Sequence, residues 1–497
     1  MNDKKEIRTR FAPSPTGELH IGGLRTALTC FLFARKNNGT FIVRSEDTDR
    51  TRLVEGAAKR QIEDLYWSGL TIDEGVLVEN GEIVQKGEYG PYVQSERLAI
   101  YKKYVDKLLD EGKAYHCFCT PKRLDEMRKA QQAEKKPPKY DRTCLNLSKE
   151  EIDEKIKNGE DYVIRFKVPE GKTEFDDLVY GHIEVDNSTI DDQIIMKSDG
   201  FPTYHLAVVV DDYLMKISHV FRGAEWIAST PKHVLLYSAL GWQDKMPIFC
   251  HMANILDKNK KKLSKRDGSV SVADFRDDGY PKEAVINFIA LLGWNPKTEQ
   301  EIFTMDELIE QFDTTKMNKA GGVFDRDRLK WMSKEHLKRM SVDTIYTESL
   351  PFLKRKDYYK NATENKKQED YIKKIITVEQ GRLETFKDVG EENQFFFVDK
   401  VTVDKDLLRW KENTDEETVE VLQKALSILQ GIQENDWTRE NLEKILMDSA
   451  GEKRGDFLWP LRAALTGVKR SPSPFDCAWV LGKTQTLERI TDALKIF

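Results

Sequence analysis

Residues 8–28 place a short strand pattern, a loop rich in proline, serine and glycine, and a helical pattern one after another. A strand, a glycine loop and a helix N-terminus together form a phosphate site, because free backbone N–H groups and the helix dipole face the anion. Gly22 and Gly23 let a flat base or a ribose approach the backbone closely. His20 lies beside the loop, where it can donate to a phosphate oxygen. The segment therefore predicts an α/β domain that binds a nucleotide.

A run of basic residues is the second candidate for binding phosphate, because six of the nine residues 258–266 are Lys or Arg. The whole chain carries a formal charge of −6, so it is not a basic nucleic-acid binder overall, although a local basic face still attracts phosphate. Lys262 and Lys265 lie on a loop that ends at Gly268, and both can reach one phosphate group. Cleavage of ATP between its α and β phosphates needs positive charge where negative charge develops on the pyrophosphate. We therefore expect both lysines to stabilise that charge.

The pattern of expected elements changes at about residue 335. Before it, short β-branched runs alternate with helical patterns, as in α/β domains, and residues 41–44 and 205–210 are expected strands. Residues 231–240 predict a helix with a proline in its first turn and Gly241 after its end. Beyond residue 335, Glu, Lys, Leu and Asn recur at helical spacing, which predicts an all-helical region. A length of 497 residues accommodates about three domains of roughly 150 residues each.

Residues 111–195 differ from the α/β sequence around them and are expected to be an insertion between two halves of one sheet. The insertion holds Cys117, Cys119 and Cys144, which could serve as three soft ligands for zinc. Six cysteines in so long a chain indicate a reducing compartment and not a disulfide framework. His116 is a further candidate ligand, and three free thiols in an ordinary core are the alternative.

The first six residues contain no apolar segment of a secretory signal, and no run of 18 apolar residues occurs in the chain. We therefore expect a cytoplasmic protein without a membrane span.

The two phosphate motifs resemble those of class I aminoacyl-tRNA synthetases. The pattern P-S-P-T-G-x-L-H-x-G-G at residues 13–23 resembles their His-Ile-Gly-His motif, and K-L-S-K-R at residues 262–266 resembles their Lys-Met-Ser-Lys-Ser loop. Glycine in place of the second histidine is similar to the bacterial glutamyl-tRNA synthetases, whereas the glutaminyl enzymes carry P-E-P-N-G and keep that histidine. The resemblance implies catalytic roles for His20, Lys262 and Lys265, and contacts with ATP from His20, Gly22, Gly23, Glu225 and Lys265.

A glutamate substrate carries two carboxylates and one ammonium, so its pocket needs two cations and one anion. Planar Arg side chains suit carboxylates because they bind them with two parallel hydrogen bonds. The segments E-D-T-D-R, G-x-P-T-Y-H-L-A and R-x-x-E-W resemble the family's glutamate pocket. In that pocket, Arg222 would bind the side-chain carboxylate and Glu46 the α-ammonium. The full set of implied contacts is Arg10, Ser14, Glu46, Tyr204 and Arg222.

Some relatives of this family hold zinc in their inserted domain with the pattern C-x-C…Y-x-x-x-C. Here the pattern corresponds to Cys117, Cys119, Tyr140 and Cys144. The resemblance therefore implies a structural zinc ion, Zn²⁺, with no open position for catalysis.

The second half of the chain also resembles the family. Residues 321–332 are similar to its junction between the catalytic body and the helical part, and residues 459–467 to a segment of its anticodon-binding domain. Gln380 lies in the expected anticodon-reading region. Enzymes restricted to the glutamate tRNA often have Arg at that position, whereas Gln is associated with enzymes that also charge the glutamine tRNA. The resemblance thus implies relaxed tRNA specificity at Gln380.

The resemblance implies a doubly wound, Rossmann-type α/β catalytic domain, an inserted α/β acceptor-binding domain, and all-α stem-contact and anticodon-binding domains. The expected segments are 1–110 (first Rossmann half, with His20), 111–195 (acceptor-stem-binding insertion), 196–270 (second Rossmann half, with Lys265), 271–335 (stem-contact domain) and 336–497 (helical anticodon-binding domain).

The implied reaction joins glutamate to tRNA. ATP with Mg²⁺ activates L-glutamate to glutamyl-adenylate, and a terminal ribose hydroxyl of tRNA(Glu), or also of tRNA(Gln), takes the glutamyl group. No covalent protein nucleophile is needed, so positioning and electrostatic stabilisation supply the catalysis. The resemblance also implies that activation waits for bound tRNA, and we expect a monomer. Two alternatives are a tRNA-modifying glutamyl transferase, which lacks the anticodon domain, and an inactive zinc-dependent RNA-binding paralogue.

Overall fold

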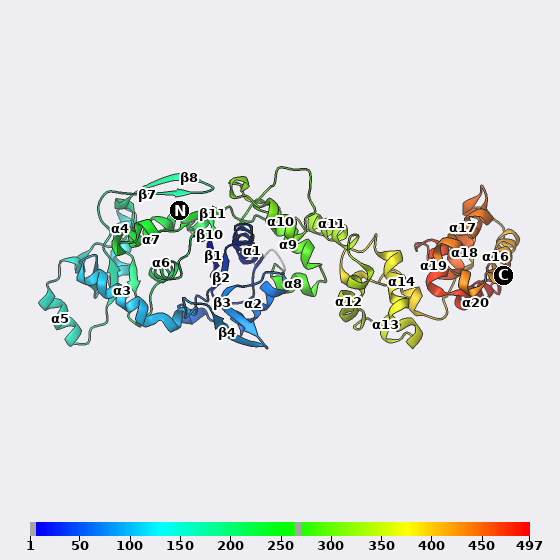
Figure 1. Ribbon diagram of the computed structural model, residues 1–497, viewed down its shortest axis with the longest axis horizontal. Helices are drawn as coiled ribbons and strands as arrows, with labels where there is room; N and C mark the ends of the chain where they lie inside the picture. Colours follow the sequence, from blue (N-terminus) through cyan, green and yellow to red (C-terminus); the bar gives the residue numbers. More distant parts are fainter. Residues whose placement is uncertain (1–5, 264–269) are drawn as a thin grey trace. The chain divides into compact units, whose positions relative to one another are not determined.

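The computed structural model describes residues 6–263 and 270–497 of the chain (Figure 1). The chain forms two compact units: the first extends to residue 275 and includes 285–325, and the second contains 276–284 and 326–497. Lys265, the second lysine of the expected phosphate loop, lies outside the described residues. Within the two described stretches, no helix is long and apolar enough to cross a membrane.

The first unit is built on an eight-stranded sheet with the order β4-β3-β2-β1-β10-β11-β7-β8. Neighbouring strands from β3 to β7 run parallel, and only the edge strands β4 and β8 run antiparallel to their neighbours. This arrangement confirms the expected doubly wound α/β fold. The strands are β1 (Arg8–Phe11), β2 (Thr40–Val43), β3 (Glu74–Glu79), β4 (Glu82–Lys86), β7 (Lys172–Asp177), β8 (Gly181–Asp186), β10 (His219–Gly223) and β11 (Ile248–Met252).

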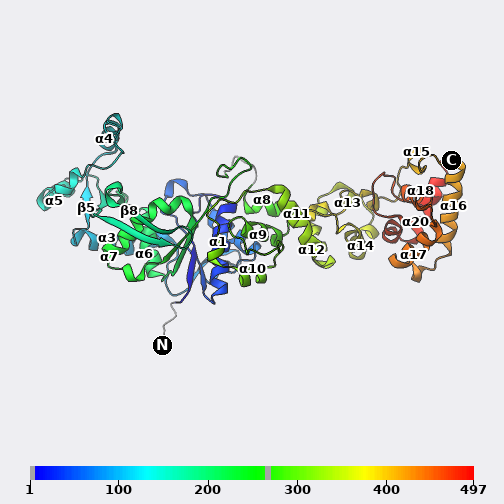
Figure 2. The same cartoon turned by 90° about the horizontal axis from the view of Figure 1, so that it is seen from above.

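Helices cover both faces of this sheet: α1 lies on one face, and α6 and α7 lie on the other (Figures 1 and 2). Helix α7 has Pro231 in its first turn and ends at Gly241, whose φ of +77° is the left-handed conformation that suits glycine, as the sequence predicts. The helices are α1 (Ile21–Lys36), α2 (Ala57–Trp67), α3 (Leu98–Asp110), α6 (Tyr204–Leu214), α7 (Thr230–Leu240), α8 (Val272–Asp277), α9 (Lys282–Leu291) and α10 (Met305–Gln311).

The prediction of a strand at residues 205–210 is wrong, because these residues lie in helix α6. Every residue from Leu206 to Asp212 is buried, in a core shared with α3 and α7. A helix that is buried on all sides shows no polar face and so loses its 3.6-residue periodicity. The β-branched run therefore resembled a strand.

A second, three-stranded sheet belongs to the expected insertion. It consists of β5 (Ala114–Cys117), β6 (Val163–Phe166) and β9 (Ile194–Met196), all antiparallel. Helices α4 (Pro121–Ala133) and α5 (Lys149–Lys157) accompany it and contribute no buried residue. The range 111–195 is divided, however, between the small sheet and the large one. Strands β7 and β8 lie within this range but belong to the large sheet, which β7 joins through the pairing of Asp177 with Phe249.

The second unit contains helices and, among its described residues, no strand, which confirms the expected all-helical region. Its core draws on α12, α14 and α16–α20. The unit begins at residue 326 and also includes 276–284, so the expected segment 271–335 is shared between the two units. Its helices are α11 (Arg326–Leu337), α12 (Val342–Leu353), α13 (Asp357–Lys360), α14 (Glu369–Glu379), α15 (Lys405–Leu408), α16 (Asp415–Gly431), α17 (Arg439–Ala450), α18 (Arg454–Thr466), α19 (Pro474–Leu481) and α20 (Lys483–Leu494).

Candidate functional site

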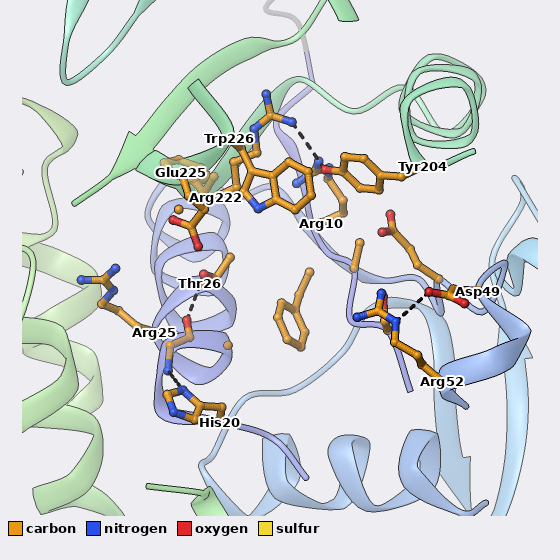
Figure 3. A pocket seen from close by; sticks show the side chains of 18 of the residues that line it. Arg10, His20, Arg25, Thr26, Asp49, Arg52, Tyr204, Arg222, Glu225 and Trp226 are labelled. Atoms are coloured by element: carbon orange, nitrogen blue, oxygen red, sulfur yellow. Dashed lines mark hydrogen bonds and ion pairs between the residues drawn. The ribbon is translucent and has the colours of Figure 1, made fainter. Parts of the chain in front are cut away.

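A cavity of about 770 Å³ opens in the first unit, where β1 and β10 end and α1 begins (Figure 3). A ligand crevice at the carboxyl ends of the strands is the usual place in a doubly wound sheet. Ten of the expected site residues line this one cavity: Arg10, Ser14, His20, Gly22, Gly23, Glu46, Tyr204, Arg222, Glu225 and Lys262. Residues more than 200 positions apart in the sequence therefore line one cavity.

His20 is the N-cap of α1, and its Nδ1 accepts a hydrogen bond of 3.1 Å from the backbone N–H of Gly22. In a neutral imidazole that accepts through Nδ1, the proton is on Nε2. The start of α1 lies at the cavity, since His20, Gly22 and Gly23 all line it, and a helix N-terminus suits an anion. A Cβ atom at Gly23 would lie 3.0 Å from the Leu19 side chain, so a larger residue would crowd this turn.

A buried network of charges supports the floor of the cavity. Arg10 Nε and Arg44 Nη1 lie 3.0 and 2.8 Å from the same oxygen, Oδ1 of Asp212. Arg44 Nη2 also bonds to Glu46 Oε1 at 3.0 Å. Burial raises the pKa of Glu46, and Arg44 offsets only part of that rise. Burial also opposes ionisation of Asp212, yet Arg10 and Arg44 hold its pKa below the ordinary value.

Arg222 at the end of β10 makes a different set of contacts, all with neutral groups. Its Nε bonds to His251 Nε2 at 3.0 Å, its Nη2 to Thr230 Oγ1 at 2.7 Å, and its Nη1 to His233 Nδ1 at 3.1 Å. Tyr204 Oη lies 3.5 Å from Nη1. No carboxylate of a described residue lies within 4.0 Å of this guanidinium. Burial lowers the pKa of Arg222, because the charged guanidinium loses contact with water.

The same cavity is also lined by residues expected to contact the nucleotide. Lys262 Nζ lies 3.0 Å from Glu225 Oε1. Arg25 on α1, which the sequence did not single out, also lines the cavity and donates from Nη2 to the carbonyl of Ala253 at 2.6 Å. Burial lowers the pKa of Arg25 to about 10. Ser14 lies exposed in the loop after β1.

The sequence patterns also did not predict that Arg44, Asp212 and Arg25 belong to the site. The sequence does contain a signal for Asp212, which follows Asp211 at the end of a long apolar run. Acidic residues in such a run are expected to be buried and paired with a cation. Arg44 and Arg25 have no local pattern that separates them from surface cations.

The cysteines of the insertion form a cluster. The sulfur atoms of Cys117, Cys119 and Cys144 lie within 4.8 Å of one another. The hydroxyl of Tyr140 lies 3.3 Å from Cys117 Sγ and 3.4 Å from Cys119 Sγ, so the expected fourth donor also converges on them. His116 is not part of this group and its ring packs against Tyr162 at 5.0 Å. Four donors at this spacing suit a tetrahedral zinc ion, whose thiolate ligands stand about 3.8 Å apart.

Gln380, the expected specificity residue, directly follows α14. Its Nε2 donates to the carbonyls of Leu337 and Met340 at 2.9 and 2.8 Å. The amide therefore lies at the C-terminal end of α11, where backbone carbonyls lack helical partners.

Comparison with known proteins places the chain in a family. The family described as "tRNA synthetases class I (E and Q), catalytic domain" matches residues 6–331, and "Anticodon binding domain" matches residues 344–494. The second match argues against a tRNA-modifying transferase without an anticodon domain.

Individual relatives agree with both matches. A glutamate–tRNA ligase of Clostridioides difficile (strain 630) is 51% identical over 400 residues, 80% of each chain. One of Alkaliphilus metalliredigens (strain QYMF) is 45% identical over 489 residues, 98% of each chain. The crystal structure of a glutamate tRNA ligase from Elizabethkingia meningosepticum CCUG26117 in complex with its amino acid covers 99% of each chain, with 36% identity and a TM-score of 0.86. The chain therefore belongs to the glutamate–tRNA ligase family of class I tRNA synthetases.

Proposed function

We propose that this chain activates L-glutamate with ATP to glutamyl-adenylate, releases pyrophosphate, and transfers the glutamyl group to the terminal adenosine of tRNA(Glu). The observation that carries the proposal is the buried guanidinium of Arg222, which lines the nucleotide cavity among neutral partners. A buried cation without a carboxylate in contact is ready to bind one from a ligand, with two parallel hydrogen bonds.

In this proposal, the pocket matches each charge of glutamate. Arg222 binds the side-chain carboxylate and Tyr204 borders it. Among the described residues, Glu46 bonds to Arg44 through Oε1, which leaves Oε2 for the α-ammonium. Arg10 and Ser14 lie beside the α-carboxylate, which attacks the α-phosphorus of ATP. Glutamine lacks the second negative charge and would leave Arg222 buried without a counter-ion.

ATP occupies the other side of the cavity in this proposal. His20, Gly22 and Gly23 at the start of α1 hold phosphate and ribose, Glu225 contacts the nucleotide, and Lys262 and Lys265 stabilise the leaving pyrophosphate. Magnesium arrives bound to the phosphates of ATP and shields their charge. The chain needs no covalent nucleophile, because holding the two substrates in line supplies much of the rate.

Glutamate-dependent exchange of pyrophosphate into ATP, measured with and without tRNA, tests this function. We expect exchange with tRNA present, and loss of most of it in R222A. R35A is the matched control, because Arg35 pairs with Asp73 on the surface and does not line the cavity. Absence of exchange even with tRNA would overturn the proposal.

Relaxed tRNA specificity is a further part of the proposal and depends on Gln380. We expect the chain to charge both tRNA(Glu) and tRNA(Gln), and Q380R to charge tRNA(Gln) less. Arg can keep a bond to the carbonyls that Gln380 now contacts, so the variant should fold. Equal charging of both tRNAs before and after the change would count against this role.

We also propose a structural zinc ion bound by Cys117, Cys119, Tyr140 and Cys144. Arg165 and Arg123 support it, because they lie 3.2 and 3.3 Å from Cys117 and Cys119 and would offset the charge of the thiolates. Metal analysis of the purified protein should find about one zinc per chain. C119S should lose it, and C250A, a change at a buried cysteine elsewhere, should keep it. Less than about half an equivalent of zinc in the unaltered chain would contradict the site. A monomeric state and a cytoplasmic location stay predictions.

A further inference from the structure

A buried carboxylate and imidazole, Asp177 and His251, stand behind Arg222. They come from adjacent strands, β7 and β11, and neither lines the cavity. Both side chains are fully buried. His251 Nδ1 lies 2.6 Å from Asp177 Oδ2, and its Nε2 lies 3.0 Å from Arg222 Nε. The three side chains therefore form a chain of hydrogen bonds that leads from β7 to the pocket.

Asp177 fixes which nitrogen of His251 carries the proton. Its Oδ2 also accepts from the backbone N–H of His251 at 3.0 Å, and its Oδ1 from those of Val179 and Tyr180 at 2.9 Å. Burial alone would raise the pKa of Asp177, but these donors hold it below the ordinary value. An ionised carboxylate can only accept, so His251 carries its proton on Nδ1. Its Nε2 lone pair then accepts from Arg222.

The other contacts of Arg222 are neutral as well. Thr230 Oγ1 accepts from Arg222 Nη2 at 2.7 Å, because a guanidinium can only donate, and its hydroxyl also lies 3.1 Å from the carbonyl of Trp226 and 3.2 Å from His251 Nε2. His233 Nδ1 accepts from Nη1, and its Nε2 meets His205 Nδ1 at 3.0 Å. These groups orient the guanidinium without neutralising it. A carboxylate in their place would compete with that of a substrate.

We propose that Asp177 and His251 are positioning residues for amino-acid specificity: they hold Arg222 so that its charge and remaining N–H groups face the substrate's side-chain carboxylate. The inference rests on the proposed function of the cavity. It adds the residues that hold Arg222 in place to those that contact the substrate. In D177N, the amide oxygen keeps the bonds from Val179 and Tyr180, the amide NH₂ then faces the His251 ring, and the backbone N–H of His251 loses its acceptor. The NH₂ group favours a proton on Nε2, which turns a donor toward Arg222.

Kinetics of charging with D177N test this inference. We expect the KM for glutamate to rise about 10- to 100-fold, as when an outer partner of a binding group is lost. The KM for ATP should stay within about twofold, since no ATP contact changes, and the preference for glutamate over glutamine should fall. H251F should behave like D177N. H251Q should recover part of the glutamate affinity, because its amide oxygen can replace the acceptor at Nε2.

The chain supplies a matched control in a second Asp–His pair, on the hairpin of β7 and β8 that also carries Asp177. Asp176 and His182 lie 3.0 Å apart, but their side chains are 86% and 60% exposed. D176N should leave both KM values and the melting temperature unchanged. An unchanged KM for glutamate in D177N would overturn the inference, and so would an equal rise of both KM values with a lower melting temperature. Failure of the unaltered chain to charge glutamate would instead refute the proposed function.

Discussion

Lys262 Nζ and Glu225 Oε1 form an ion pair of 3.0 Å between the phosphate loop and the segment after β10. The two side chains are 60% and 43% exposed. Exposed pairs of this kind contribute at most about 1 kcal/mol. A phosphate group with greater charge can therefore take Lys262 from Glu225 when ATP binds.

Replacing Lys262 should consequently affect catalysis and not stability. We expect K262A to slow glutamate-dependent ATP–pyrophosphate exchange about 100-fold, the usual effect of removing one donor that stabilises transition-state charge. Its melting temperature should match that of the unaltered chain. K59A is the control, because Lys59 faces Glu63 on the surface of α2. Exchange in K262A within twofold of the unaltered chain would refute the role.

Asp212 should be essential to the stability of the first unit. D212N removes the carboxylate that Arg10 and Arg44 share, and leaves two buried cations with less compensation. We expect a loss of about 3–5 kcal/mol, as for other broken buried pairs. E18Q breaks the exposed Glu18–Arg60 pair and should cost less than about 1 kcal/mol. Calorimetry of both variants compares the two, and equal melting temperatures would contradict the expectation.

The strand, loop and helix start at residues 8–28 were predictable from sequence because these residues are close along the chain. The loop at residues 13–23 combines turn chemistry with a helix start, and both are local properties. Asp177, His251 and Asp212 were not predictable in this way. Strand order brings Asp177 beside His251, and that order is a long-range property of the sheet. The position of Asp212 could not be predicted because the sequence of α6 resembles a strand. Side chains in a strand alternate between two faces, whereas Asp212 lies on a helix.

The half-buried rings of Trp410 and Trp459 border a hollow in the second unit that Arg462 also lines. The two rings lie 4.8 Å apart, and the Arg462 guanidinium lies 4.6 Å over Trp459. Aromatic rings beside a cation suit the stacking of an unpaired RNA base, at about 1–3 kcal/mol per base. We therefore expect W459A to weaken tRNA binding about 5- to 150-fold in a filter assay. W479A is the control, since Trp479 has a similar pairing with Lys374 elsewhere in the unit. Equal tRNA affinity of W459A and W479A would contradict the expectation.

Tyr140 can be tested separately as the fourth ligand of zinc. Y140F removes only the hydroxyl that meets Cys117 and Cys119, and keeps the ring beneath Arg165. If that oxygen binds zinc, Y140F should release the metal to a chelator faster than the unaltered chain, because three ligands hold it less tightly than four. Y162F, in a neighbouring ring that faces His116, should release it at the unaltered rate. Equal release by Y140F would remove Tyr140 from the ligand set.

Glu379 should make the second unit less stable as the pH rises. Burial raises the pKa of Glu379 to about 7 from the value of 4.5 for an exposed carboxyl, although Gly390 and Asn393 donate to it. Below about pH 4.5 the folded and unfolded states are both protonated, and the group has no effect on their difference. Between pH 4.5 and 7 the unfolded chain loses the proton first, so stability falls at up to about 1.4 kcal/mol per pH unit.

E379Q removes this titration and should flatten the dependence. Its amide can keep both bonds if the Asn393 amide turns over, so the packing is retained. We expect the melting temperature of E379Q to equal that of the unaltered chain near pH 4.5 and to exceed it above pH 7. E443Q, at an exposed site on α17, should follow the unaltered chain throughout. Parallel curves for E379Q and the unaltered chain would show that the proton on Glu379 does not contribute to the stability of this unit.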